Sequence, residues 1–172
     1  MTRLYPVPEE MKHDILMKQF EWEFDDQRLK GNSVIPSFFY ELSYYSGLIG
    51  VRPWENRDEV IPLIIMEWNQ ERTKLHAIFK ARRSKDAEPG MLRAIELFLV
   101  LVFWGNHKPV RLDGLEEQLI QLPVKPVNIQ ERLSFVISRP SLYPAFIQLG
   151  ELFLEAEKQI IKSMALEKAR KR

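Results

Sequence analysis

One apolar segment, residues 91–104, constrains the fold of this chain more than any other part of it. Its sequence is MLRAIELFLVLVFW, in which only Arg93 and Glu96 carry a charge. A helix that is apolar on every side is buried on every side, so we expect these residues to form the central helix of the fold. Pro89 suits the first turn of that helix, and Gly105 suits its end.

Two other structures are possible for an apolar segment of this kind. A membrane span needs about 20 mostly apolar residues, and this segment is shorter and is flanked by Lys85 and Lys108. Residues 97–104 could form a buried parallel strand, because a short apolar run does not distinguish a strand from a helix. No companion strands bounded by glycine or proline lie nearby, so the sequence favours a buried helix and no membrane span.

The composition is that of an ordinary folded domain. Apolar residues make up 45% of the 172 residues and charged residues 28%, as in soluble globular proteins. The net charge of +1 gives no global attraction to nucleic acid or to an anionic membrane. The chain has no cysteine, which excludes disulfides and thiolate chemistry, and its start lacks the apolar region of a secretory signal. We therefore expect a cytoplasmic location.

Helical periodicity recurs along most of the chain. Two long amphipathic helices are predicted, one after Asn56 and one after Ser141, and shorter helices begin near Pro8, Ser33 or Pro36, Asp113 and Asn128. The predicted fold is all-α, a compact orthogonal or irregular bundle of about six to seven helices around residues 91–104. It forms a single domain, 1–172, with an N-terminal arm over about 1–33 and a frayed basic tail over about 166–172. Gly150 lies inside the last helix, so we expect a neighbouring backbone to pass close to it.

The aromatic residues suggest a protein-binding surface. Residues 20–24 alternate aromatic and acidic side chains, which predicts an extended segment with its three rings on one side. Packing in the core explains such rings, but the number near the N-terminus favours a docking surface as well, since tryptophan and tyrosine dominate interface anchors. The candidate protein-binding residues are Trp22, Phe24, Tyr44, Tyr45 and Trp54.

Residues with catalytic or metal-binding potential are few. Glu10 and His13 have the E-x-x-H spacing of di-iron bundles, which use that motif twice together with two further glutamates. Glu67 and Glu71 share a helix face near His76, and paired carboxylates can act as acid and base. A salt-bridged helix face is the simpler interpretation. We predict no metal site, no cofactor and no enzymatic activity.

Two basic patches, residues 74–85 and 158–172, support an alternative function. Cationic side chains at helix ends contact phosphates or simply complement the helix dipole. The candidate nucleic-acid-binding residues are Arg72, Lys74, Lys80, Arg82, Arg83, Arg170, Lys171 and Arg172. The alternative function is that of a nucleic-acid-associated accessory protein in replication or repair.

Four segments resemble the YpoC-like family of small uncharacterised proteins of Gram-positive bacteria. They are FFYELSYYSG, PWENRDEVIPLIIMEWNQER, LFLVLVFWGN and KPVNIQERLSFVISRP. The resemblance runs from about Ser37 to the last helix. It implies an all-helical cytoplasmic protein with no established activity and no catalytic residues to carry over. The family's association with genes for DNA replication, repair and cell-wall synthesis implies a partner in those processes.

The leading hypothesis is a non-enzymatic helical protein that acts by binding another, unidentified protein. This hypothesis rests on the excess of aromatic residues together with the lack of a catalytic motif. A homodimer formed through the long helices would give the same sequence pattern.

Overall fold

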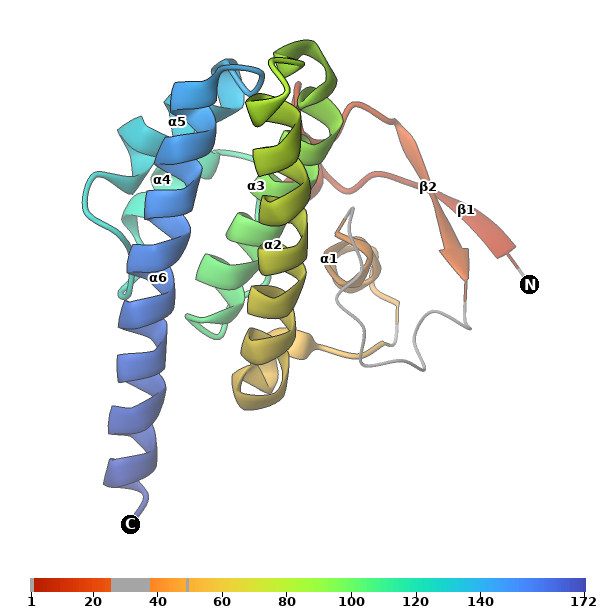
Figure 1. Cartoon of the computed structure of the whole chain (residues 1–172). Helices are drawn as coiled ribbons and strands as arrows, with labels where there is room; N and C mark the ends of the chain where they lie inside the picture. Colours follow the sequence, from red (N-terminus) through yellow and green to blue (C-terminus); the bar gives the residue numbers. More distant parts are fainter. Residues whose placement is uncertain (1, 26–37, 49) are drawn as a thin grey trace.

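The computed structural model describes residues 2–25, 38–48 and 50–172 and is mostly helical (Figure 1). The helices are α1 (Phe39–Tyr45), α2 (Arg57–Lys80), α3 (Glu88–Trp104), α4 (Leu115–Ile120), α5 (Ile129–Ser138) and α6 (Tyr143–Arg170). The strands are β1 (Thr2–Pro6) and β2 (Glu21–Asp25), and short 3-10 turns occupy Glu9–Met11, Pro53–Glu55 and Ser84–Asp86. The mostly helical prediction is confirmed. The purely all-α prediction is wrong, because β1 and β2 form an antiparallel pair.

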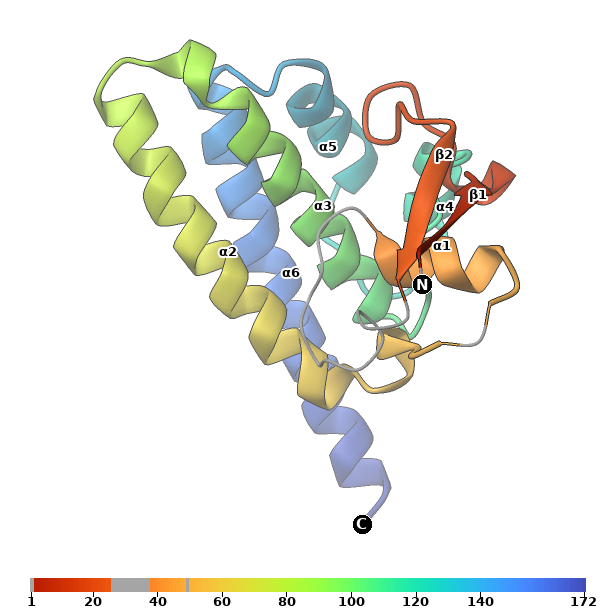
Figure 2. The same cartoon turned by 90° about the vertical axis from the view of Figure 1, so that its right-hand side faces the viewer.

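Helix α3 lies inside the molecule, and every residue from 97 to 104 is buried. Helices α2 and α6 pack against it and against each other, as both views show (Figure 1, Figure 2). In Figure 1, α4 and α5 lie toward the same side of the molecule as α6, while α1 and the two strands lie on the opposite side. The all-round apolar sequence of α3 is thus matched by neighbours on all its sides.

Side chains of neighbouring helices come close to the backbone at two glycines, one near each end of α3. A Cβ atom at Gly90 would lie 2.9 Å from Leu75 Cδ2, and one at Gly105 would lie 2.5 Å from Ile160 Cδ1. These two glycines let α2 and α6 reach α3. At Gly150 a Cβ atom would meet nothing within 4 Å, so the predicted close contact there is wrong.

The N-terminal segment is a hairpin rather than a helix. The predicted extended segment is β2, and it pairs with β1 in a register that places Tyr5 opposite Trp22. The helix expected from Pro8 is reduced to the turn Glu9–Met11. His13 Nδ1 accepts hydrogen bonds from the backbone N–H groups of Ile15 and Leu16, both at 3.1 Å. A side chain that satisfies these donors competes with the helix.

The remaining predictions on segments have mixed outcomes. The helix start expected at Ser33 or Pro36 lies outside the described residues, and α1 begins at Phe39. The basic tail expected to fray is helical as far as Arg170. Within the described ranges, no helix combines the length and apolarity needed to cross a bilayer.

Candidate functional site

The aromatic residues chosen from the sequence form a connected series of ring contacts inside the fold. Trp22 lies 5.8 Å from Phe39, and Tyr40 lies 5.9 Å from Trp104. Further along the series, Trp104 contacts Trp54 at 6.4 Å between ring centroids. The series links the hairpin to α3 through α1.

Most of the aromatic residues proposed as a protein-binding surface are buried. Trp22, Phe24 and Trp54 are at most 8% exposed, so they are core residues and do not present an exposed binding surface. Tyr45 is half-buried, and Tyr44 is 38% exposed beside Arg52. The hairpin needs these rings because it has one face to bury, and Trp22 and Phe24 bury that face against Phe39 of α1.

Glu41 on α1 is a buried carboxylate that the sequence reasoning missed. It is completely buried, and its Oε2 accepts hydrogen bonds from Trp104 Nε1 at 2.7 Å and from the Val110 N–H at 3.1 Å. Burial raises the pKa of Glu41 to about 7, against the lowering effect of these hydrogen bonds. Burial and the nearby Glu41 also raise the pKa of Tyr45. The carboxylate ties α1 to the end of α3 inside a closed site, so it has no access to a substrate.

The two basic patches are exposed but separate. The turn between α2 and α3 lies at one end of the molecule, and the C-terminus of α6 lies at the other (Figure 1). Arg83 forms an ion pair with Asp86 at 2.8 Å, and Lys171 forms one with Glu167 at 3.5 Å. Arg72 and Lys74 are exposed in the middle of α2. The eight candidate nucleic-acid-binding residues do not form one continuous footprint.

Two of the acidic and histidine residues chosen from the sequence, His13 and Glu71, have structural partners. His13 caps a turn, and burial lowers its pKa. Glu71 forms an ion pair with Arg93 at 3.2 Å, while burial raises the pKa of Glu67. Across the described part of the chain, no group of three or more histidine, aspartate or glutamate residues is placed to hold a metal ion.

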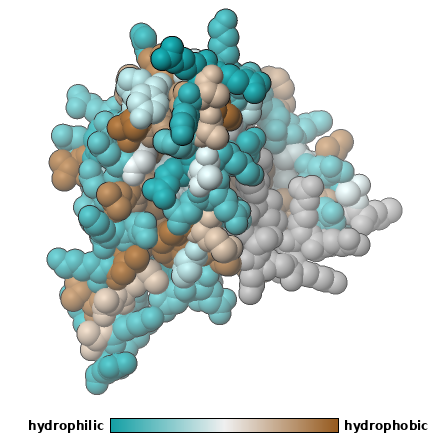
Figure 3. Space-filling view, viewed as in Figure 1, coloured by the Kyte–Doolittle hydropathy of each residue, from teal (hydrophilic) through white to brown (hydrophobic). Residues whose placement is uncertain are grey.

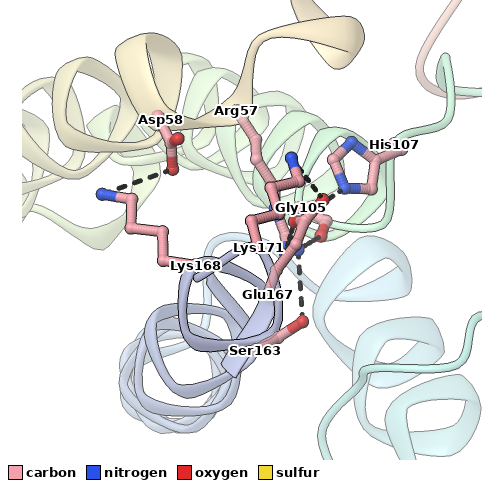
Figure 4. Close-up of polar contacts among 8 residues, drawn as sticks. All are labelled: Arg57, Asp58, Gly105, His107, Ser163, Glu167, Lys168 and Lys171. Atoms are coloured by element: carbon pink, nitrogen blue, oxygen red, sulfur yellow. Dashed lines mark hydrogen bonds and ion pairs between the residues drawn. The ribbon is translucent and has the colours of Figure 1, made fainter. Parts of the chain in front are cut away.

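A polar cluster fastens the C-terminal half of α6 to the rest of the fold (Figure 4). The buried guanidinium group of Arg57 donates to Gly105 O at 2.8 Å, to Ser163 Oγ at 3.2 Å and to Glu167 Oε2 at 2.5 Å. His107 Nε2 lies 3.5 Å from the same Glu167 oxygen. The hydrogen bond from Arg57 lowers the pKa of Glu167.

This cluster lines a hollow of about 570 Å³. The two terminal nitrogens of Arg57 are already bound by oxygens from α3 and α6. The arrangement therefore joins three elements, the start of α2, the end of α3 and the last turns of α6.

A groove of about 650 Å³ is lined by residues of the β1–β2 connection, α4 and α5 and of the segment before α4. Its floor is apolar and consists of Ile15, Leu112, Leu115, Leu119, Leu133 and Ile137. Its rim carries four acidic residues, Asp14, Asp113, Glu116 and Glu117. Lys12 is the rim's basic side chain, and it forms an ion pair with Glu9. Of the residues chosen from the sequence, His13 alone lines this groove.

Hydrogen bonds join the segments that form the walls of the groove. The carbonyl oxygen of Glu10 accepts from the N–H groups of Leu112 and Asp113, at 2.9 and 3.1 Å. Across the other wall, Glu116 accepts from Gln130 Nε2 at 3.1 Å. The groove is hard to predict from the sequence, because residues 12–15 lie far along the chain from the rest of its lining.

These features define a mostly helical protein with buried aromatic residues and an acidic groove. The family model described as YpoC-like protein matches residues 58–168. The chain is also 33% identical over 139 residues to "Uncharacterized protein YpoC" of Bacillus subtilis (strain 168), an alignment that covers 80% of this chain and 81% of the relative. No solved structure gives a significant match. The chain belongs to the YpoC-like family, as its sequence segments suggested.

Proposed function

We propose that this protein is a non-enzymatic interaction factor of the cytoplasm that binds a cationic, amphipathic segment of another protein in the groove between residues 12–15, α4 and α5. The observation that carries the proposal is the combination of an apolar floor with an acidic rim. Its volume of about 650 Å³ lies within the usual size of binding pockets, roughly 300–1,000 Å³.

The charge of the rim selects the occupant. The rim has four carboxylates, of which Asp113 is paired with Arg111 at 3.5 Å, and one lysine, which is paired with Glu9. The lowered pKa of His13 favours its neutral form. A segment with basic residues beside apolar anchors would satisfy both the rim and the floor. Complementary charge of this kind provides specificity and faster association.

A binding role also agrees with what the candidate catalytic residues do. Glu71 is paired with Arg93, and His13 accepts two backbone hydrogen bonds. Both side chains therefore make contacts that are explained by structure alone. The nucleic-acid alternative has less support, because its two basic patches lie at opposite ends of the molecule (Figure 1).

The test is selection of peptides from a random displayed library on the purified protein. Peptides that are enriched should carry lysine or arginine beside large apolar residues at helical spacing. Their affinity is then measured for the wild type and for a groove variant, Asp14→Lys with Glu117→Lys. We expect binding to the groove variant to be about tenfold weaker or worse, since each reversal replaces an attraction by a repulsion.

A matched control distinguishes an effect of the groove charges on binding from an effect of the protein's net charge. Glu23→Lys with Glu59→Lys changes the net charge equally at two exposed residues outside the groove, and it should bind like the wild type. Circular dichroism establishes that both variants fold. The proposal fails if no cationic amphipathic peptide is enriched, or if enriched peptides bind the groove variant as tightly as the wild type.

A further inference from the structure

Helix α6 has a second apolar stripe on the face that does not enter the core. Ile147, Leu154 and Ile161 follow one another at intervals of seven residues, and they are 42%, 53% and 48% exposed. Residues seven apart on a helix share a face, and such spacing is the pattern of helices that pair along a seam. Figure 3 shows apolar side chains among hydrophilic ones on the side of the molecule where α6 lies.

The stripe continues into a shallow apolar groove between α6 and α2. This groove has a volume of about 390 Å³ and is lined by Phe146, Ile147 and Gly150 from α6, with Arg72, Thr73 and His76 from α2. Gly150 contributes by leaving space, because a Cβ atom there would meet nothing within 4 Å. A side chain from another molecule could enter at this point.

The charges of α6 are segregated along its length. The charged residues of the first half, 143–157, are all acidic: Glu151, Glu155 and Glu157. The second half, 158–172, has six basic residues and one acidic residue, Glu167. In an antiparallel pair that crosses near Leu154, the last acidic residues of one copy would approach the first basic residue of the other, Lys158, whereas a parallel pair in register would place like charges together.

We propose that the α6 stripe is the interface of an antiparallel homodimer with its two-fold axis at Leu154. Ile147 and Ile161 lie seven residues before and after Leu154, so each would contact the other in the second copy. The two-fold axis makes the interface self-complementary, as in most homodimers.

One specific ion pair follows from this geometry. Glu151 lies three residues before Leu154 and Lys158 lies four residues after it, on the same flank of the stripe. In an antiparallel pair, Glu151 of one copy would lie beside Lys158 of the second copy, and the symmetry would form this pair twice. Within the described chain, neither side chain has an ion-pair partner of its own.

On the other flank, Glu157 would reach the small groove of the second copy. Glu157 lies three residues after Leu154, and Gly150 lies four residues before it. The basic side chain beside Gly150 in that groove is Arg72. Glu157 and Gly150, which shares its groove with Arg72, are therefore three and four residues from the proposed axis.

The test is the oligomeric state by sedimentation velocity and light scattering from micromolar to submillimolar protein. The wild type should be a dimer in this range, and Leu154→Glu should be a monomer because two carboxylates would meet on the axis. Val127→Glu, at a residue 70% exposed on the loop before α5, should remain a dimer. Both variants replace exposed side chains, and circular dichroism checks their helix content.

Charge reversal tests the orientation of the two helices. Glu151→Lys and Lys158→Glu should each weaken dimerisation by about tenfold, because each places like charges together twice. The double variant should restore it, since the pair is re-formed with its charges exchanged. Because the chain has no cysteine, Leu154→Cys alone should give a disulfide-linked dimer on mild oxidation, and Val127→Cys should not.

The proposal is overturned if the wild type is a monomer at every concentration, or if Leu154→Glu dimerises like the wild type. Failure of the double reversal to restore dimerisation would overturn the antiparallel arrangement. These results are independent of the peptide-binding groove, whose variants lie on other elements.

Discussion

The buried carboxyl group of Glu41 makes the stability of this fold depend on pH. Its pKa rises from the ordinary 4.5 to about 7 in the folded protein. Between these two values the folded state holds a proton that the unfolded chain has released, so the free energy of unfolding falls as the pH rises from about 4.5 to about 7. Each pKa unit corresponds to about 1.4 kcal/mol, and the loss across this range is therefore about 3 kcal/mol.

The substitution Glu41→Gln isolates this effect. Glutamine is neutral at every pH, and its carbonyl oxygen can still accept hydrogen bonds from Trp104 and Val110. The difference in unfolding free energy between the variant and the wild type should therefore shift by about 3 kcal/mol in favour of the variant between about pH 5 and about pH 8. Urea unfolding, followed by circular dichroism at both pH values, measures it.

Glu59→Gln is the control, because Glu59 is exposed on α2. Its stability relative to the wild type should be the same at both pH values. All other titrating groups are shared by the wild type and the variants, so their contributions cancel in these differences. If Glu41→Gln differs from the wild type by the same amount at both pH values, Glu41 is not protonated by burial and the argument is refuted.

Three further predictions concern packing, the polar cluster and the basic patches. In a Leu154→Glu background, Gly105→Ala should lower the free energy of unfolding by about 1–3 kcal/mol through overpacking, while Gly150→Ala should raise it by up to about 1 kcal/mol; urea unfolding distinguishes the two. Arg57→Met should lower it by about 1–3 kcal/mol. Because the pKa of Glu167 is lowered, that loss should be complete above about pH 4.5 and shrink at more acidic pH. Fluorescence anisotropy with duplex and single-stranded DNA should show at most weak binding that salt abolishes, and tight binding in salt would contradict the separation of the patches.

The sequence predicted those elements whose pattern is local. Helix α3 can be predicted because 14 consecutive residues are almost entirely apolar. Strand β2 can be predicted because aromatic and acidic side chains alternate along it. The pairing of β2 with β1 was missed because β1, with the sequence TRLYP, is mostly exposed and has no alternation of its own. The helix expected from Pro8 does not form, because His13 Nδ1 accepts hydrogen bonds from the backbone N–H groups of Ile15 and Leu16.

The candidate sites were harder to predict, because burial is a property of the whole fold. The alternation in β2 shows that Trp22 and Phe24 share a side, but it does not show that Phe39 covers that side. The second stripe of α6 was overlooked for a related reason. Its core face, which includes Phe146 and Phe153, already accounts for the apolar periodicity, so the exposed residues beside it add only a wider apolar face.

The two proposed surfaces share no residue, so a dimer would carry two identical grooves. One surface lies on α6 and α2, and the other on α4, α5 and residues 12–15. A ligand with two cationic segments could then bind both grooves of one dimer, and the second contact would form at a high effective concentration. Two copies of a selected peptide joined by a long flexible linker should bind the wild type more tightly than they bind Leu154→Glu. Single peptides should bind both proteins equally, and equal binding of the linked peptides would show that the two grooves do not act together.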